Sequence, residues 1–252
     1  MTDLAIRDKK IIWHPFSQEK TAGLPLSIES AKGAYLYDFD KKAYVDLISS
    51  WWVNAHGHAN PIIAEAIYQQ ALKLEHVIFS QITHEPAVML CENLQAILPS
   101  HLSRFFFSDN GSTAVEAGLK IAYQYWQNTD QTKRIKFACF EGGYHGDTIG
   151  AMSVSKQKFH DIFKQLLFEK VVFPFAETWL KDKEIEYKEE IALKKIKMLL
   201  EKQGGEISAF VLEPLVQGVS GMRICRPEFL NKVIKLVQSY GILIICKNSY
   251  LI

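Results

Sequence analysis

Short apolar runs alternate with longer amphipathic stretches along most of the chain, beginning near residue 60. Such runs, bounded by Gly, Pro, Asn or Asp, are typical of buried strands. The runs that predict strands are RFFFS (104–108), 135–140, 171–173, ISAFVLEP (207–214) and 242–245. Because nearly uninterrupted apolar runs suit parallel strands that are covered on both faces, the pattern predicts an α/β fold with a mostly parallel sheet.

The amphipathic stretches between these runs predict helices with clear start and stop signals. Asn60 followed by Pro61 is an N-cap with proline at the first helical position, and a second helix is predicted from Pro86. The charged stretch 181–202 predicts a solvated helix whose buried face includes Ile191, Ile196 and Leu199. Further helices are predicted over 113–127 and over 227–240, where Gly241 ends the last one.

The first 60 residues do not follow this rhythm. They contain AYLYDFDKKAYVDL (34–47), which predicts a hairpin with an FDKK turn. We therefore expect two domains: residues 1–60 as an N-terminal arm and part of a small domain, and residues 61–252 as the large domain.

Composition narrows the function. Lys and Arg total 29 against 28 acidic residues, which argues against a nucleic-acid or membrane partner. No stretch is apolar enough to span a bilayer, and the first twenty residues lack a signal-peptide core. The four widely spaced cysteines indicate reduced thiols in a cytoplasmic protein. His56 and His58 have no third ligand nearby, so no metal site is expected.

The segment FFFSDNGSTAVEAGLKIA (105–122) places a predicted strand, a short polar loop and a helix in succession. Gly111 permits close backbone approach, and Ser112 and Thr113 add hydroxyl donors at the positive end of the helix dipole. This arrangement binds phosphate. A helix N-cap with nothing bound explains the same residues equally well.

Two further loops follow predicted strands. In EGGYHGD (141–147), glycines surround Tyr144 and His145, so that an aromatic ring can stack on a flat cofactor; a tight turn with a structural histidine is the simpler alternative. Glu213 ends another predicted strand, where its carboxylate can hydrogen-bond a ligand or cap a neighbouring loop.

The double tryptophan in DLISSWWVNAHGHANP (46–61) is a third candidate. In an extended backbone, Trp51 and Trp52 point to opposite sides. One of them can then line a pocket while the other packs against the protein.

Together these segments resemble the class III pyridoxal-phosphate aminotransferases of fold type I. The resemblance covers nearly the whole chain and rests on IWHPF, SSWW, ITHEPA, DNGSTAVE, QYWQ, GGYHGDTIGAMSVS and EPLVQGVSGM, in this order. The double tryptophan and YHGDTIGAMSV favour the subfamily of biotin biosynthesis. Its members transfer an amino group from S-adenosylmethionine to 8-amino-7-oxononanoate and form homodimers.

The resemblance implies specific roles for residues of this chain. Gly111 and Ser112 would hold the phosphate of pyridoxal 5′-phosphate. Tyr144 would stack near the pyridine ring and shape the substrate site, and Glu213 would lie close to the cofactor. Trp51 would line the substrate pocket.

Three positions depart from the family pattern. Phe16 stands where relatives often have Tyr, so a hydroxyl contact to the substrate is in doubt. After the predicted strand 242–245, the family has an Asp-Glu pair whose Asp keeps the pyridine nitrogen protonated. Lys247 and Asn248 occupy those positions here.

The family lysine that binds the cofactor would lie beyond residue 252, so the resemblance implies no catalytic residue within this chain. Lys247 belongs to a different strand and is not expected to replace that lysine. We expect a truncated, inactive aminotransferase, with a shifted reading frame after Cys246 or ordinary divergence as the cause. A class III enzyme with another amino donor and a non-catalytic fragment are the alternatives.

Overall fold

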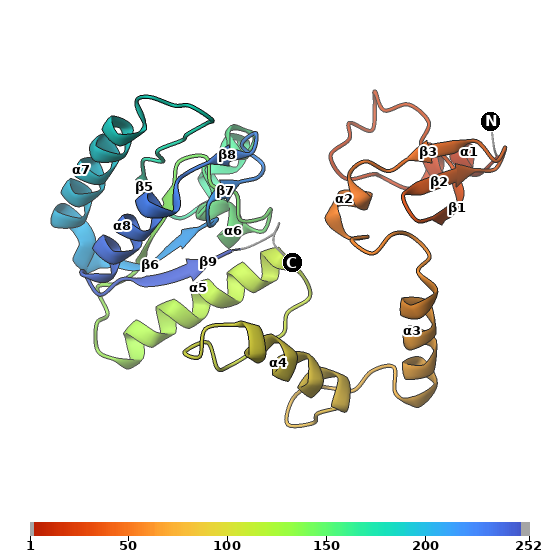
Figure 1. The fold of residues 1–252 in the computed structure, drawn as a ribbon, viewed down its shortest axis with the longest axis horizontal. Helices are drawn as coiled ribbons and strands as arrows, with labels where there is room; N and C mark the ends of the chain where they lie inside the picture. Colours follow the sequence, from red (N-terminus) through yellow and green to blue (C-terminus); the bar gives the residue numbers. More distant parts are fainter. Residues whose placement is uncertain (1–2, 248–252) are drawn as a thin grey trace. The chain divides into compact units, whose positions relative to one another are not determined.

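The computed structural model describes residues 3–247. The chain divides into two compact units between Ser103 and Arg104. Figure 1 shows both units. The domain boundary expected at residue 60 stays a prediction.

The first unit combines a small antiparallel sheet with four helices. Its strands pair in the order β1-β2-β3, and Leu36 lies opposite Tyr44, which confirms the predicted hairpin. The elements are α1 (Asp3–Ile11), β1 (Ile28–Lys32), β2 (Tyr35–Asp38), β3 (Ala43–Val45), α2 (Ser49–Trp52), α3 (Pro61–Lys73) and α4 (Glu85–Ile97).

The helix starts of the first unit follow from their capping residues. The Asn60 side chain accepts hydrogen bonds from the backbone N–H groups of Ile62 and Ile63, which confirms the start of α3 at Pro61. His84 caps α4 by accepting from the N–H of Ala87, one turn into the helix. Helix α4 therefore begins one residue before the predicted Pro86.

The second unit is a parallel sheet with helices on both faces, which confirms the predicted α/β class. Its strands lie in the order β5-β4-β6-β9, all parallel. The strands are β4 (Lys136–Phe140), β5 (Lys170–Phe173), β6 (Ile207–Leu212) and β9 (Leu243–Cys246), with a small hairpin of β7 (Val216–Gln217) and β8 (Arg223–Ile224). The helices are α5 (Gly111–Asn128), α6 (Ile149–Ser153), α7 (Ile185–Gln203) and α8 (Pro227–Gln238), with 3₁₀ turns at Lys158–Leu166 and Gly204–Glu206.

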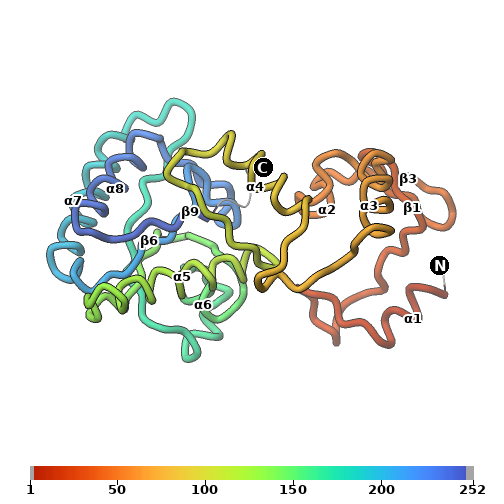
Figure 2. The backbone as a smooth tube through the Cα atoms, turned by 90° about the horizontal axis from the view of Figure 1, so that it is seen from below, coloured from red at the N-terminus to blue at the C-terminus, as the bar shows by residue number. Residues whose placement is uncertain are grey.

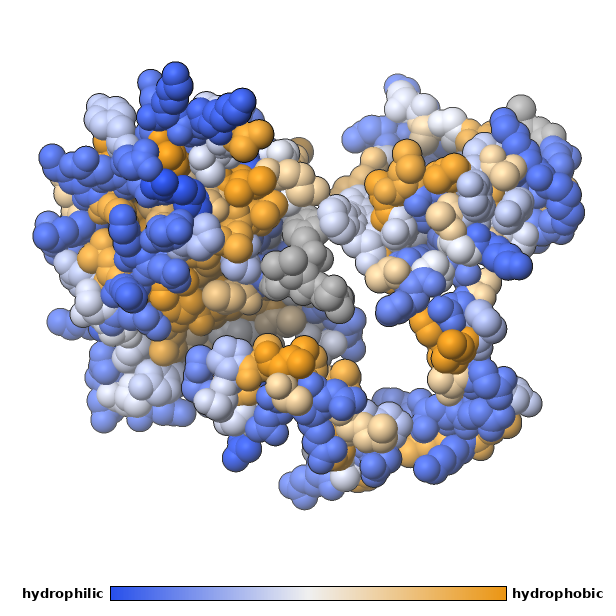
Figure 3. Space-filling view, viewed as in Figure 1, coloured by the Kyte–Doolittle hydropathy of each residue, from blue (hydrophilic) through white to orange (hydrophobic). Residues whose placement is uncertain are grey.

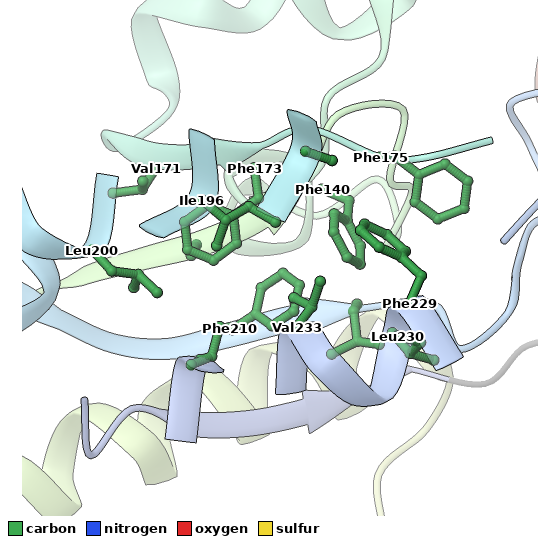
Figure 4. Packing of buried hydrophobic residues seen from close by; sticks show 14 of the residues in the cluster. Phe140, Val171, Phe173, Phe175, Ile196, Leu200, Phe210, Phe229, Leu230 and Val233 are labelled. Carbon is green, nitrogen blue, oxygen red and sulfur yellow. The ribbon is translucent and has the colours of Figure 1, made fainter. Parts of the chain in front are cut away.

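Strand β6 lies at the centre of two apolar layers because all six of its residues are buried. Phe210 and Leu212 face the layer under α7 and α8, while Ala209 and Val211 face the layer under α5. Figures 1 and 2 show α7 and α8 side by side, and Figure 4 shows how the aromatic rings of the larger layer pack. Because successive side chains of a strand point to opposite faces of the sheet, β6 contributes residues to both layers.

Three local predictions were wrong. Residues 104–108 are not a strand, because a strand requires a backbone ladder and the described four-stranded sheet does not include this segment. Ile191 is 37% exposed, whereas Ile196 is fully buried against the sheet. The backbone at Trp51 and Trp52 is not extended: both lie in a short turn with φ of 65° and 74°.

Candidate functional site

The carboxyl ends of β4, β6 and β9 meet at one edge of the sheet. Strand β4 leads into the glycine loop 141–146, β6 leads into Glu213, and β9 leads into Lys247. The backbone N–H of Lys247 donates to the carbonyl of Leu212 at 2.8 Å, which extends the β6–β9 ladder to this residue. In parallel α/β sheets, ligands bind at this edge.

Helix α5 starts beside the same edge with free N–H donors. Asn110 is its N-cap: the Asn110 side chain accepts from the N–H of Thr113 at 3.0 Å, and the Thr113 hydroxyl closes the capping box. The backbone N–H groups of Gly111 and Ser112 precede the first helical hydrogen bonds and bond no described residue. The space in front of Gly111 is open, with no atom within 4 Å of where a Cβ would stand. An anion can therefore approach these donors.

The start of α5 is in contact with the glycine loop. A Cβ added to Gly146 would overlap the Ser112 hydroxyl, and Gly146 has a φ of 133° that side-chain-bearing residues rarely adopt. Glu116 on α5 accepts from the N–H of Gly150 at 2.7 Å and so fixes α6 against α5. Gly146 thus permits Ser112 and the Tyr144 loop to lie together.

Glu213 anchors the loop that carries Tyr144. Its carboxylate accepts from the N–H of Tyr144 at 2.9 Å and from the N–H of Gly218 at 3.1 Å. The side chain is only 3% exposed, and this burial raises the pKa of the Glu213 carboxyl above its ordinary value. Glu213 therefore joins the loops after β4 and β6. Capping of a neighbouring loop was one of the two roles that the sequence suggested for this carboxylate.

The Tyr144 ring is held in a fixed orientation. Its hydroxyl donates to Asp147 at 2.7 Å, and the second oxygen of Asp147 lies 3.0 Å from Nε2 of His160. The ring stacks against His160 with centroids 5.9 Å apart, and Nζ of Lys247 lies 5.2 Å from the Tyr144 centroid. A ring fixed on two sides is suited to orient a flat ligand.

Burial lowers the pKa values of two basic groups at this edge, His145 and Lys247. Burial, followed by the nearby charge of Lys247, lowers the pKa of His145 to about 3. Neither ring nitrogen of His145 has a hydrogen-bond partner among the described residues. Burial also lowers the pKa of the Lys247 amine. At neutral pH His145 is therefore an uncharged, structural part of the site.

Three side chains that the sequence did not single out as site residues hold the glycine loop through hydrogen bonds to its carbonyl groups. Gln217 donates to the carbonyl of Glu141 at 2.8 Å, and Ser220 and Gln157 both donate to the carbonyl of Gly142. Gly142 has a φ of 73° and no room for a Cβ. The hydrophobic pattern carries no signal for such contacts, because they join segments far apart in the chain.

Trp51 and Phe16 lie together in the first unit. Their ring centroids are 5.3 Å apart, and Trp51 is 64% exposed. The pocket role expected for Trp51 stays a prediction, because the structure places this residue only within its own unit. Asn248 lies outside the described residues.

Neither a membrane-spanning helix nor a metal-binding cluster is found within residues 3–247. No helix there is long and apolar enough to cross a membrane. No group of three or more His, Cys, Asp or Glu residues in this range is arranged to hold a metal ion.

Comparison with known proteins gives consistent matches. The family model described as aminotransferase class III matches residues 16–247. The chain is 50% identical over 235 residues to the adenosylmethionine-8-amino-7-oxononanoate aminotransferase of Synechococcus elongatus, covering 93% of this chain and 55% of the relative. The protein of the same name from Staphylococcus aureus is 40% identical over 247 residues, covering 95% and 55%.

The fold agrees with these matches. The crystal structure of adenosylmethionine-8-amino-7-oxononanoate aminotransferase from Methanocaldococcus jannaschii matches with a TM-score of 0.87 and 34% identity, over 97% of this chain and 54% of that one. This chain thus spans about half the length of the relatives that it matches. The family match covers nearly all residues of this chain. The chain therefore belongs to the class III aminotransferases.

Proposed function

We propose that residues 104–247 hold the phosphate and ring of pyridoxal 5′-phosphate. The observation that carries this proposal is the convergence of three features at one sheet edge: the free N–H groups at Gly111 and Ser112, the oriented ring of Tyr144, and the Glu213 anchor. The donors and the open space at Gly111 fit a phosphate group. Tyr144 fits an aromatic ring beside it.

The cofactor, when bound, supplies an electron sink for amino-group transfer. The residues of this chain then have binding and orienting roles. Gly111 and Ser112 hold the phosphate through backbone and hydroxyl donors, and Tyr144 fixes the plane of the ring. Glu213 keeps Tyr144 in place through its backbone bond. Gly146 keeps the Tyr144 loop close enough to Ser112 for one ligand to reach both.

For the whole protein we propose the reaction named for its relatives, with S-adenosylmethionine as amino donor and 8-amino-7-oxononanoate as acceptor, in the cytoplasm. Identities of 40–50% with proteins of this name support the proposal. Trp51 is proposed to line the pocket for the apolar chain of the acceptor, because an exposed indole offers a flat apolar wall.

We also propose that the whole protein is a homodimer. Helices α3 and α4 expose apolar side chains that a soluble monomer rarely leaves uncovered, including Ile62, Ile67, Leu72, Met89, Leu90 and Ile97. Figure 3 shows hydrophobic surface over both helices. Light scattering of the whole protein tests this proposal, and a monodisperse monomer contradicts it.

For the 252-residue chain alone we expect cofactor binding without turnover. The chain spans about half the length of its relatives. It also carries a cation, Lys247, where the family resemblance implies the carboxylate that keeps the pyridine nitrogen protonated. A cation at that place opposes protonation of the ring.

The substrate proposal is tested by joining this chain to the C-terminal half of the Synechococcus elongatus relative and restoring Asp at position 247. We expect amination of 8-amino-7-oxononanoate that requires S-adenosylmethionine. Trp51→Ala should lower kcat/KM for the acceptor by about tenfold, or ~1.4 kcal/mol. Trp179→Ala, a change of a similarly exposed tryptophan, is the matched control. Equal activity with common amino acids as donors contradicts the proposal and favours another class III reaction.

A further inference from the structure

Four consecutive residues of the first unit, Ser49–Trp52, have φ angles of 48°, 46°, 65° and 74°. At Ser50 and Trp51, ψ angles of 54° and 47° complete the left-handed helical conformation. Residues with a side chain disfavour this conformation, and none of the four is glycine or asparagine. The turn therefore needs contacts that fix it, because such strain persists only where the surrounding structure imposes it.

The carboxylate of Asp46 supplies contacts of this kind. Its Oδ2 accepts from the hydroxyl of Ser50 at 2.8 Å, and its Oδ1 accepts from the N–H of Ile48 at 3.3 Å. Nε2 of His58 lies 2.8 Å from Oδ2, and the side chains of His58 and Asp46 are 13% and 6% exposed. The bonds from His58 and Ser50 hold the pKa of the Asp46 carboxyl below its ordinary value, so that it is ionised at neutral pH.

Asp46 and His58 are both anchored to the segment between β1 and β2. The N–H of Asp46 donates to the carbonyl of Ala34 at 2.9 Å. His58 and Gly33 form a β-bridge in which each N–H donates to the other carbonyl, at 2.8 and 3.1 Å. A Cβ at Gly57 would stand 3.1 Å from Cα of Gly33, so glycine lets the two segments approach. The carboxylate is thus fixed to the sheet and can hold the turn.

The turn presents Trp51 to Phe16, the aromatic pair of the first unit. The ring centroids lie 5.3 Å apart, and Phe16 also has a positive φ, of 56°. Strained backbone of this kind clusters at ligand sites. If the turn relaxed to an ordinary helix or strand, the Trp51 ring would point elsewhere, because the direction of the Cα–Cβ bond follows the backbone.

We propose that Asp46 is a positioning residue for binding of the amino acceptor. Together with its partners Ser50 and His58, it holds the left-handed turn that orients the Trp51 indole. The inference rests on the proposed function for the role of Trp51 in acceptor binding. Because its side chain is 6% exposed, Asp46 acts through Trp51 and not on the acceptor itself.

Kinetics of the joined protein described above test the role of Asp46. Asp46→Asn replaces the carboxylate by an amide of the same shape, and kcat/KM for 8-amino-7-oxononanoate should fall by at least about fivefold, mainly through KM. Adding Ser49→Gly to Asp46→Asn should recover at least about threefold, because glycine adopts a positive φ without strain. The Ser49 side chain forms no hydrogen bond with any described residue, so this second change removes none.

Asp38→Asn is the matched control for Asp46→Asn. The carboxylate of Asp38 accepts from the N–H groups of Asp40 and Lys42 and from the hydroxyl of Tyr44. It fixes the turn between β2 and β3 and makes no contact with the tryptophan turn. We expect kcat/KM for the acceptor to change by less than about twofold.

Fluorine NMR of the 252-residue chain labelled with 5-fluorotryptophan reports on the turn without turnover. Asp46→Asn should shift or broaden the signals of Trp51 and Trp52, and adding Ser49→Gly should restore them. The signals of Trp126 and Trp179, in the second unit, should stay unchanged in every variant.

The outcomes separate this inference from the proposed function. If Trp51→Ala lowers kcat/KM for the acceptor and Asp46→Asn does not, the inference alone is wrong. A loss in Asp46→Asn that Ser49→Gly does not recover, or one that Asp38→Asn shares, also overturns it. If Trp51→Ala has no effect, the proposed acceptor pocket is wrong and the positioning role of Asp46 fails with it.

Discussion

The two units of the chain treat their apolar residues in opposite ways. In residues 104–247, aromatic and aliphatic side chains fill two layers on either side of a parallel sheet. Among the described residues of the first unit, the buried hydrophobic ones are Ala5 and Ala87, while Ile62, Ile67 and Leu72 are exposed. The second unit thus has a core of its own, whereas the first has secondary structure without one.

This difference indicates how each unit obtains its stability. Capping residues and the short hairpin shape the first unit locally, but such interactions contribute only about 1 kcal/mol each. Isolated helices of about a dozen residues are marginal in water. The first unit therefore depends on cover from outside itself, and we propose that the whole homodimer supplies it.

The largest effect should come from emptying the core of the second unit. Phe210 is fully buried and its ring packs against Phe140 and Phe173 at centroid distances of 4.9 and 5.1 Å. Phe210→Ala should lower the free energy of unfolding by about 3–5 kcal/mol. Ile62→Ala, at a residue that is 79% exposed in the first unit, should change it by less than about 0.5 kcal/mol. Urea unfolding followed by circular dichroism measures both, and equal losses would remove the contrast between the units.

Acid should destabilise the second unit through His145. Its pKa is about 3 in the folded protein against an ordinary value of 6.5. The unfolded chain therefore binds the extra proton between these values, and stability falls as the pH drops from 6.5 towards 3. The total loss from this group is on the order of 4 kcal/mol.

The variant His145→Gln isolates this contribution, because glutamine does not titrate. We expect a flatter dependence of the unfolding free energy on pH between 3 and 6.5 than in the unchanged chain. His76→Gln, at an exposed histidine of the first unit, is the matched control and should leave the profile unchanged. An identical slope in the chain and in His145→Gln would show that His145 titrates normally.

A smaller effect distinguishes two helix caps of the same type. Asn110→Ala removes the cap of α5 and should lower the unfolding free energy of the second unit by about 1 kcal/mol. Asn60→Ala removes the corresponding cap of α3. Because α3 lacks a core to couple it to the rest, this change should reduce the helical signal without shifting the unfolding midpoint of the second unit. A shared shift in both variants would mean that the units unfold together.

The sequence predicted what depends on local chemistry and missed what depends on distant partners. The start of α3 at Pro61 and the polar, capped loop that opens α5 at Gly111 follow from residues next to each other in the chain. The hydrogen bonds of a strand instead depend on a partner strand elsewhere in the chain, which is why residues 104–108 were wrongly predicted as a strand. The left-handed turn at Trp51 also has no local signal, because only glycine or asparagine usually marks such a conformation.

The candidate site shows the same division. Gly111, Ser112, Tyr144 and Glu213 were chosen from their own loops, and the structure brings these four to one sheet edge. The contact between Ser112 and Gly146 was not foreseen, since it joins a helix start to a loop more than thirty residues away. The pocket role of Trp51 remains a prediction, since this residue belongs to the other unit.

Calorimetric titration of the 252-residue chain with pyridoxamine 5′-phosphate tests the central claim most directly. Gly111→Asp places a carboxylate in open space at the first helical position, where it favours the helix but repels phosphate. Gly205→Asp, also in open space, is the matched control. We predict saturable binding that Gly111→Asp weakens by at least about tenfold, or ~1.4 kcal/mol, and that Gly205→Asp leaves unchanged. Equal affinity in all three chains, or no binding to the unchanged chain, would contradict the phosphate site at the start of α5.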